Sequence, residues 1–200
     1  MTKDDIRNRI WDLLEMENLV SFPRPCRGRI PNFVGSDQAG KRIRELDEFR
    51  EANCIFCAPD RVLKRVREIV LEEGKTLAVA LPHMTGFLQI EERKRIEQAT
   101  TIKGFRRFGK PLQMKIDLFV QGSVAVDATG NRLGKGKGYG DQEWEYLKKQ
   151  RLMNGHEKTV TVVREEQIVE NLSGLMEPWD KRIDYILTPE RVIRCGQEMM

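Results

Sequence analysis

The densest group of residues suited to chemistry is a glycine-rich segment in the second half of the chain. Five of the sixteen glycines fall in one run, Gly130-Asn131-Arg132-Leu133-Gly134-Lys135-Gly136-Lys137-Gly138-Tyr139-Gly140-Asp141. Glycine lacks a Cβ atom, so consecutive backbone N–H groups can turn toward an anion. Arg132, Lys135 and Lys137 add full positive charges. The segment therefore predicts a cradle for a polyphosphate.

The elements on either side of this segment strengthen that interpretation. A strand is predicted over 124–126, and a helix over 141–151, whose positive N-terminal end would face the same anion. The spacing matches neither Gly-x-x-x-x-Gly-Lys-Ser/Thr nor Gly-x-Gly-x-x-Gly. A flexible hairpin with exposed lysines is the competing interpretation.

Hydrophobic periodicity predicts an alternating α/β chain. Helices are expected over 3–19, from residue 36 through 49, over 59–73, 91–99 and 141–151, and strands over 53–58, 76–81, 116–120, 124–126, 160–163, 185–187 and 192–193. Gly74 is the expected left-handed helix end. Strand–helix–strand units with short connections predict a parallel sheet in a three-layer α/β domain spanning residues 1–200.

The composition allows a core and gives no membrane signal. Hydrophobic residues make up 40% of the 200 and charged residues 33%. The longest apolar run, 77–81, is far shorter than the ~20 residues that cross a bilayer. The first residues, Met1-Thr2-Lys3-Asp4-Asp5, carry acids and no apolar run, so we expect no secretory signal, a cytoplasmic protein and no membrane partner.

The net charge of +4 is mild but unevenly spread. Basic stretches without acids occupy 18–36 and 98–116. Phe105-Arg106-Arg107-Phe108 alternates stacking and charged side chains, as single-strand nucleic-acid binders do. A solvated face is the favoured interpretation of these stretches, and RNA binding is the less favoured one.

Cysteines and tryptophans have plain interpretations. Cys54 and Cys57 lie three apart on a predicted strand, so their thiols would face opposite sides, and no second ligand pair is present. A metal or redox role is therefore not favoured for them. Trp11, Trp144 and Trp179 are expected to be core or half-buried.

The glycine segment also resembles the signature of one enzyme family. Arg132-Leu133-Gly134-Lys135-Gly136-Lys137-Gly138-Tyr139-x-Asp141 is similar to the Arg-Leu-Gly-x-Gly-x-Gly-Tyr-Tyr-Asp-Arg of 5-formyltetrahydrofolate cyclo-ligases, also called methenyltetrahydrofolate synthetases. Lys3-x-x-x-Arg7 resembles their amino-terminal basic pair, and 184–189 resembles their closing strand. Phe22-Pro23-Arg24-Pro25-x-x-x-Arg29-Ile30-Pro31-Asn32-Phe33-x-Gly35 resembles the methenyltetrahydrofolate synthetase domain-containing subgroup. Some animal members of that subgroup append an RNA-recognition domain, and we expect none within these 200 residues.

The resemblance implies a fold and a reaction. The fold would be a three-layer α/β/α arrangement with a mostly parallel sheet, NagB/RpiA/CoA-transferase-like. The reaction would be ATP-driven closure of 5-formyltetrahydrofolate, or a related formyl-pterin, to the 5,10-methenyl form, with release of ADP and phosphate. The formyl oxygen attacks the γ-phosphate, N10 attacks the resulting imidate carbon, and phosphate leaves.

The resemblance also implies roles for individual residues. Arg132, Lys135 and Lys137 would neutralise the γ-phosphate. ATP would be held by Lys3, Arg7, Arg132, Gly134, Lys135, Gly136, Lys137, Gly138 and Tyr139. Asp141 and, as the weaker candidate, Asp180 would hold Mg²⁺, which prefers few carboxylates plus phosphate oxygens.

The folate side departs from the family pattern. Gly140 and Gln142 replace the second tyrosine and the arginine of the signature, and 58–61 read Ala-Pro-Asp-Arg where cyclo-ligases carry Glu-x-x-Thr. Asp60 is the one acid at that place. Two alternatives stay open: an ATP-using ligase or kinase-like enzyme with another small substrate, and a non-catalytic nucleotide- or RNA-binding protein.

Overall fold

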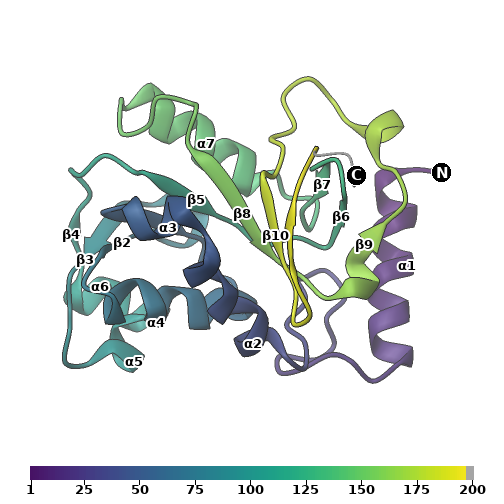
Figure 1. The fold of residues 1–200 in the computed structure, drawn as a ribbon, viewed down its shortest axis with the longest axis horizontal. Coiled ribbons are helices and arrows are strands. Elements are labelled where there is room, and N and C mark those ends of the chain that lie inside the picture. The colour runs from purple at the N-terminus through teal and green to yellow at the C-terminus, as the bar shows by residue number, and fades with distance from the viewer. Residues whose placement is uncertain (197–200) are drawn as a thin grey trace.

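The computed structural model describes residues 1–196, and an eight-stranded sheet forms its centre (Figure 1). The strand order is β11-β10-β8-β5-β1-β2-β3-β4. The parallel strands are β1 (Cys54–Cys57), β2 (Thr76–Ala80), β5 (Leu118–Val120), β8 (Lys158–Val162) and β10 (Tyr185–Leu187). The antiparallel strands at the edges are β3 (Phe87–Ile90), β4 (Lys110–Pro111) and β11 (Val192–Arg194). The predicted mostly parallel sheet is confirmed.

The central strands are continuous apolar runs because both faces of the sheet are covered. All residues of β1, β2 and β5 are buried. Successive side chains alternate between the two faces. Phe56 of β1 stacks on Phe119 of β5, with ring centroids 4.5 Å apart, and Trp144 meets Phe119 edge-on at 5.1 Å.

Helices cover the sheet on both sides and make three layers. Below it in Figure 1 lie α2 (Ser36–Lys41), α4 (Lys64–Glu72), α5 (Ile96–Ala99) and α6 (Ile102–Phe108), and above it lies α7 (Tyr139–Lys149). The helix α3 (Asp47–Glu51) follows α2 through a 3-10 turn. Other 3-10 turns cover Arg61–Leu63, Pro82–Met84, Glu165–Gln167 and Ser173–Leu175. Gly74 ends the α4 turn with φ +75°, as predicted.

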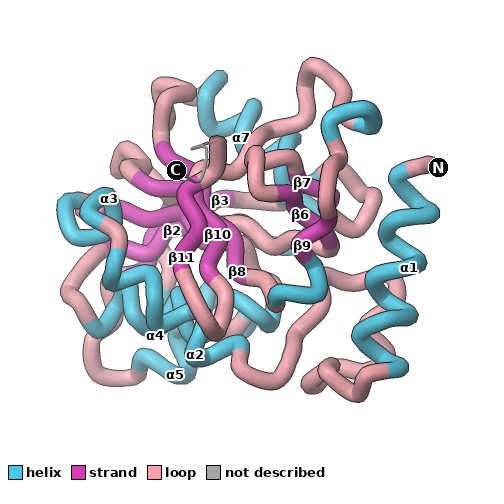
Figure 2. Tube along the Cα trace, turned by 45° about the vertical axis from the view of Figure 1, so that its right-hand side comes forward, coloured by secondary structure: helices cyan, strands magenta, loops and turns pink. Residues whose placement is uncertain are grey.

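A second, three-stranded sheet stands beside the main one. It contains β6 (Ala125–Asp127), β7 (Arg132–Leu133) and β9 (Ile168–Val169) in the order β7-β6-β9. The helix α1 (Lys3–Met16) runs alongside this small sheet (Figure 2). Ile6, Ile10 and Leu14 of α1 share a buried cluster with Val124 and Leu133. This packing fixes where the first turns of α1 lie.

Several predicted boundaries are wrong for local reasons. Residues 87–90 form β3, an antiparallel partner of β2, and only 96–99 of the predicted helix over 91–99 are helical. The predicted strand over 124–126 is real but belongs to the small sheet, and β9 and α6 were not predicted. The helix predicted from residue 36 is broken at Arg42–Glu45, and α1 stops at Met16.

No helix within residues 1–196 combines the length and the apolar character that crossing a bilayer requires.

Candidate active site

Two cavities meet at the glycine segment 130–140. The first, of about 320 Å³, opens at the carboxyl ends of β1, β2 and β5, which is where open α/β sheets commonly bind ligands. The second, of about 330 Å³, lies between the glycine segment, the first turns of α1 and Asp180. Arg132, Gly138 and Asp141 line both cavities. The segment is therefore a shared wall with a ligand space on each side.

Two glycines of this wall adopt left-handed backbone conformations, which residues with a Cβ atom rarely adopt. Gly136 and Gly138 have φ of +92° and +69°. Gly138 is the residue before α7 and provides no side-chain cap to its first N–H groups. The segment therefore opens a helix, as predicted, and the helix presents its positive N-terminal end there.

The amino-terminal helix places two basic residues at the second cavity. The Nε atom of Arg7 donates to the Gly134 carbonyl at 2.7 Å. The Lys3 ammonium pairs with the Asp180 carboxylate at 2.5 Å. Thr2 and Asp5 form a capping box that fixes this end of α1. Lys3 and Arg7 are thus brought to the glycine segment from more than 120 residues away.

The two acids predicted to hold a metal both line the second cavity. Asp141 accepts from the Lys181 backbone N–H at 3.1 Å, and Asp180 immediately precedes that residue. Within the described residues no group of three or more His, Cys, Asp or Glu could hold a metal ion. Two carboxylates beside the glycine segment have the chemistry that Mg²⁺ prefers, since this ion takes few carboxylates and completes its shell with phosphate and water oxygens.

Trp179 corrects a sequence prediction. It was expected to be core or half-buried, but it is 70% exposed and lines the second cavity. It lies in an irregular segment between the Ser173–Leu175 turn and β10, so no periodic pattern could have revealed it.

Arg132 stands between the two cavities. Its Nε and Nη2 atoms both donate to the Gly122 carbonyl, at 2.9 and 2.7 Å. Burial lowers the pKa of Arg132, while Asp141 and Asp60 act in the opposite direction. Guanidinium groups remain protonated in proteins, so Arg132 is a fixed positive charge at the shared wall.

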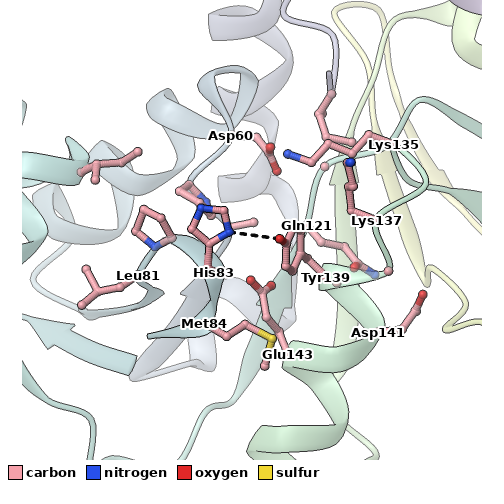
Figure 3. Close-up of a pocket in the computed structure, with 18 of the residues that line it drawn as sticks. Asp60, Leu81, His83, Met84, Gln121, Lys135, Lys137, Tyr139, Asp141 and Glu143 are labelled. Atoms are coloured by element: carbon pink, nitrogen blue, oxygen red, sulfur yellow. Dashed lines mark hydrogen bonds between the residues drawn. The ribbon is translucent and has the colours of Figure 1, made fainter. Parts of the chain in front are cut away.

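Lys135, Lys137 and Tyr139 face the first cavity (Figure 3). In that view the Lys135 side chain extends toward Asp60. Burial raises the pKa of Asp60, and Lys135 is the leading charge that opposes this shift. The Tyr139 hydroxyl lies 3.2 Å from Nδ1 of His83. All the residues predicted for the phosphate site therefore line one cavity or the other.

The turn that carries His83 is strained. His83 and Met84 both have positive φ, 57° and 54°, although neither is a glycine. Such conformations are uncommon outside glycine and concentrate at ligand sites. The turn follows β2 and brings Leu81, Pro82 and Met84 to the first cavity as an apolar wall.

Sequence reasoning missed two polar residues of the first cavity. Gln121, directly after β5, is 1% exposed, and Glu143 of α7 is 7% exposed. Burial raises the pKa of Glu143 to about 8, Asp60 adds to this shift, and Arg132 and Lys135 oppose it. The available signal was a polar residue at the carboxyl end of an apolar strand, which marks Gln121 but not Glu143.

The cysteines and the Phe105–Phe108 stretch contribute no ligand group to these cavities. Burial raises the pKa of both Cys54 and Cys57 to about 12, so both thiols stay protonated. Phe105 is fully buried in the core, while Arg106 and Arg107 are exposed on α6. The alternation of aromatic and basic residues therefore reflects an amphipathic helix, and Phe105 cannot stack on a base.

Comparison with known proteins places these features in a family context. The family model of 5-formyltetrahydrofolate cyclo-ligases matches residues 1–189. A methenyltetrahydrofolate synthase domain-containing protein of Bos taurus is 39% identical over 99% of this chain and 55% of its own length, and that of Homo sapiens 39% over 98% and 54%. A probable 5-formyltetrahydrofolate cyclo-ligase of Schizosaccharomyces pombe is 27% identical over 77% of this chain and 83% of its own length. This chain spans about half the length of the two mammalian relatives.

Solved structures agree on the fold. The 5,10-methenyltetrahydrofolate synthetase of Aquifex aeolicus superposes with a TM-score of 0.61 at 20% identity, covering 100% of this chain and 96% of the other. That of Mycoplasma pneumoniae gives 0.55 at 16% identity, covering 94% and 98%. The predicted three-layer fold with a mostly parallel sheet is therefore confirmed.

Proposed function

The chain belongs to the 5-formyltetrahydrofolate cyclo-ligase family, and from this we propose that it is an ATP- and Mg²⁺-dependent carbon–nitrogen ligase. Its substrate would be 5-formyltetrahydrofolate or a related formyl-pterin, and its products the 5,10-methenyl form, ADP and phosphate. The observation that carries the proposal is the shared wall: Arg132, Gly138 and Asp141 line two cavities of similar size.

The reaction needs two ligands whose reacting atoms meet at one phosphorus atom. The formyl oxygen forms a bond to the γ-phosphorus while the bond from that phosphorus to the bridging oxygen of ADP breaks. N10 then attacks the formyl carbon, loses its proton, and phosphate leaves. A nucleotide in the second cavity and a pterin in the first would approach the shared wall from opposite sides, which supports an in-line transfer.

The chain's own residues would position and neutralise the phosphates. Lys3 and Arg7 would hold the nucleotide from α1, and the backbone from Gly134 to Gly138 would cradle its phosphates. Arg132, Lys135 and Lys137 would balance the charge that builds on the transferred group. Asp141 and Asp180 would hold Mg²⁺, which would offset charge on the phosphate oxygens.

The test is a direct assay. The protein is incubated with 5-formyltetrahydrofolate, ATP and Mg²⁺, and the near-ultraviolet absorbance of the methenyl product is followed with ADP release. We expect one ADP per methenyl group formed and no product without ATP. Product without ATP, or none at any protein concentration, rejects the proposal. ATP hydrolysis at a rate that does not depend on the folate would favour a ligase or kinase with another substrate. Retarded migration of RNA in a gel, without ATP turnover, would favour a binding protein.

A further inference from the structure

One wall of the first cavity carries buried polar groups that lack partners. Neither Oε1 nor Nε2 of Gln121 has a hydrogen-bond partner among residues 1–196. The Glu143 side chain is 7% exposed and lines the same cavity, and its carboxyl has no hydrogen bond from the described part of the chain. Unpaired buried polar groups destabilise a fold, so the Gln121 amide, with a largely buried carboxyl at the same cavity, requires an explanation.

The rest of this cavity has the character of a binding site for a flat ring. Leu81, Pro82 and Met84 come from the turn after β2, and Ile30 and Ile102 complete the apolar lining. Figure 3 shows Glu143 pointing from α7 into the cavity near Met84 and Tyr139. Apolar walls with a few convergent polar groups are typical of sites that orient a ring by one polar edge.

Asp60 is the other carboxyl at this cavity, but its surroundings differ. Figure 3 shows Lys135 extending toward it, and the charges of Lys135, Arg67 and Arg132 oppose, without cancelling, the burial that raises the pKa of Asp60. Cations therefore lie beside Asp60, and Glu143, which points into the cavity from α7, is the carboxyl available to donors from a ligand.

We propose that Glu143 and Gln121 determine substrate specificity by binding the polar edge of a 2-amino-4-oxopyrimidine ring. The Glu143 carboxyl accepts from the two adjacent N–H groups of that edge. The Gln121 amide pairs with the neighbouring acceptor and donor of the ring. This inference rests on the proposed function, because it takes a formyl-pterin as the substrate and assigns the side chains that recognise its ring.

The Gln121 amide occupies space that a side chain at residue 140 would need. A Cβ atom at Gly140 would lie 2.5 Å from Oε1 of Gln121, closer than side-chain atoms approach one another. The family signature has a tyrosine at this position. The absence of that side chain and the presence of the amide are thus two parts of one arrangement, and α7 supplies a glutamate, which 58–61 lack.

The experiment measures binding without turnover. 5-Formyltetrahydrofolate is titrated calorimetrically into the wild-type protein, Glu143→Gln and Gln121→Met, with Glu145→Gln on the exposed face of α7 as the matched control. Losing the pairing of two ring donors with one carboxyl predicts binding about 30-fold weaker for Glu143→Gln. Glu145→Gln should bind as the wild type does, and all variants should keep their affinity for ATP.

A second pair of ligands tests the ring edge itself. Lumazine carries an oxygen where pterin carries the 2-amino group, so it offers the Glu143 carboxyl an acceptor in place of a donor. The wild type should prefer pterin to lumazine by about 30-fold, and Glu143→Gln should lose most of this preference. Gly140→Ala, which displaces the amide without changing any charge, should weaken pterin binding by about tenfold.

Melting temperatures of the unliganded variants separate recognition from a structural role. Neither side chain has a hydrogen-bond partner among the described residues of the unliganded protein, so Glu143→Gln and Gln121→Met should be as stable as the wild type or more so. Lower melting temperatures together with weaker ATP binding would mean a structural role and would overturn the inference.

The outcomes also separate this inference from the proposed function. If Glu143→Gln leaves turnover of 5-formyltetrahydrofolate unchanged, the inference is overturned and the proposed function is kept. If the protein prefers pterin through Glu143 but shows no turnover, the inference is supported and the proposed function is rejected. A wild-type protein that binds neither pterin nor 5-formyltetrahydrofolate overturns the inference.

Discussion

The two cavities differ in how far the protein itself satisfies their polar groups. At the second cavity Lys3 pairs with Asp180, Arg7 with the Gly134 carbonyl, and Asp141 with a backbone N–H. At the first, both polar atoms of Gln121 lack partners among the described residues. A site that is already internally paired is preorganised for one ligand class, whereas an unpaired site depends on its ligand. The second cavity, where we propose that the nucleotide binds, is therefore prepared for one ligand class, and the first cavity, where we propose that the pterin ring binds, is where specificity can change.

The largest effect should come from removing charge at the shared wall. Lys135→Ala combined with Lys137→Ala should lower kcat/KM about 10³-fold, because both ammonium groups balance charge on the transferred phosphate. Steady-state kinetics measures this loss, and ATP should no longer raise the melting temperature. The control is Lys148→Ala with Lys149→Ala on the exposed side of α7. If the wall variant keeps its activity, the two lysines are ordinary surface charges.

A second prediction concerns the buried Asp127, which holds the turn that leads into the glycine segment. Asp127 is fully buried and accepts hydrogen bonds from Thr129, Asn131 and the Leu172 backbone N–H. Asp127→Asn should lower the free energy of unfolding by about 2 kcal/mol, because it removes a charge-assisted acceptor. Urea denaturation measures the loss. An unchanged midpoint would show that the turn is held by other contacts.

Asp127 also predicts a pH dependence. Burial alone would raise the pKa of Asp127, but hydrogen bonds from Asn131, Leu172 and Thr129 outweigh it and hold the pKa below its ordinary value. A carboxyl with a depressed folded-state pKa stabilises the fold above its unfolded pKa of about 3.9, and this contribution is lost as the pH falls through the folded value. The stability difference between wild type and Asp127→Asn should therefore shrink below about pH 4.

A smaller effect should separate the two cavities kinetically. Arg7→Lys keeps the charge but loses the Nε–H that donates to Gly134. The KM for ATP should rise about tenfold while the KM for the folate stays within about twofold. Arg9→Lys, an exposed position on the same helix, is the control. Equal changes in both KM values would contradict the assignment of the second cavity to the nucleotide.

The smallest effect is expected on the ring side. Tyr139→Phe removes the hydroxyl that lies 3.2 Å from His83, a contact at an exposed residue. The KM for the folate should rise only about threefold, with the KM for ATP unchanged. A loss as large as that of the lysine pair would make Tyr139 part of the phosphate machinery instead.

The same contrast explains what the sequence could predict. The nucleotide side is built from a contiguous run, residues 130–141, plus a pair four apart on one helix, and local spacing reveals both. Placement of Lys3 and Arg7 beside that run follows from the packing of α1 on the small sheet, which periodicity does not encode. The resemblance to the family supplied that link.

The residues of the first cavity could not be predicted from local spacing. Gln121 and Glu143 lie on different elements and meet only because the carboxyl end of β5 faces the first turns of α7. The strand β3 could not be predicted because it is a short antiparallel strand that follows a strained turn. The sequence marks Asp60 only as the acid at the place where cyclo-ligases carry a glutamate. Pairings of this kind depend on tertiary structure, so neither propensity nor spacing predicts them.

The close approach of Gly140 to Gln121 couples the two positions in any redesign of the cavity. A side chain introduced at 140 while glutamine remains at 121 would push the amide oxygen aside, because Oε1 is the free end of a flexible side chain. A library that varies residue 140 alone therefore also moves the amide at 121, and the two positions are best varied together.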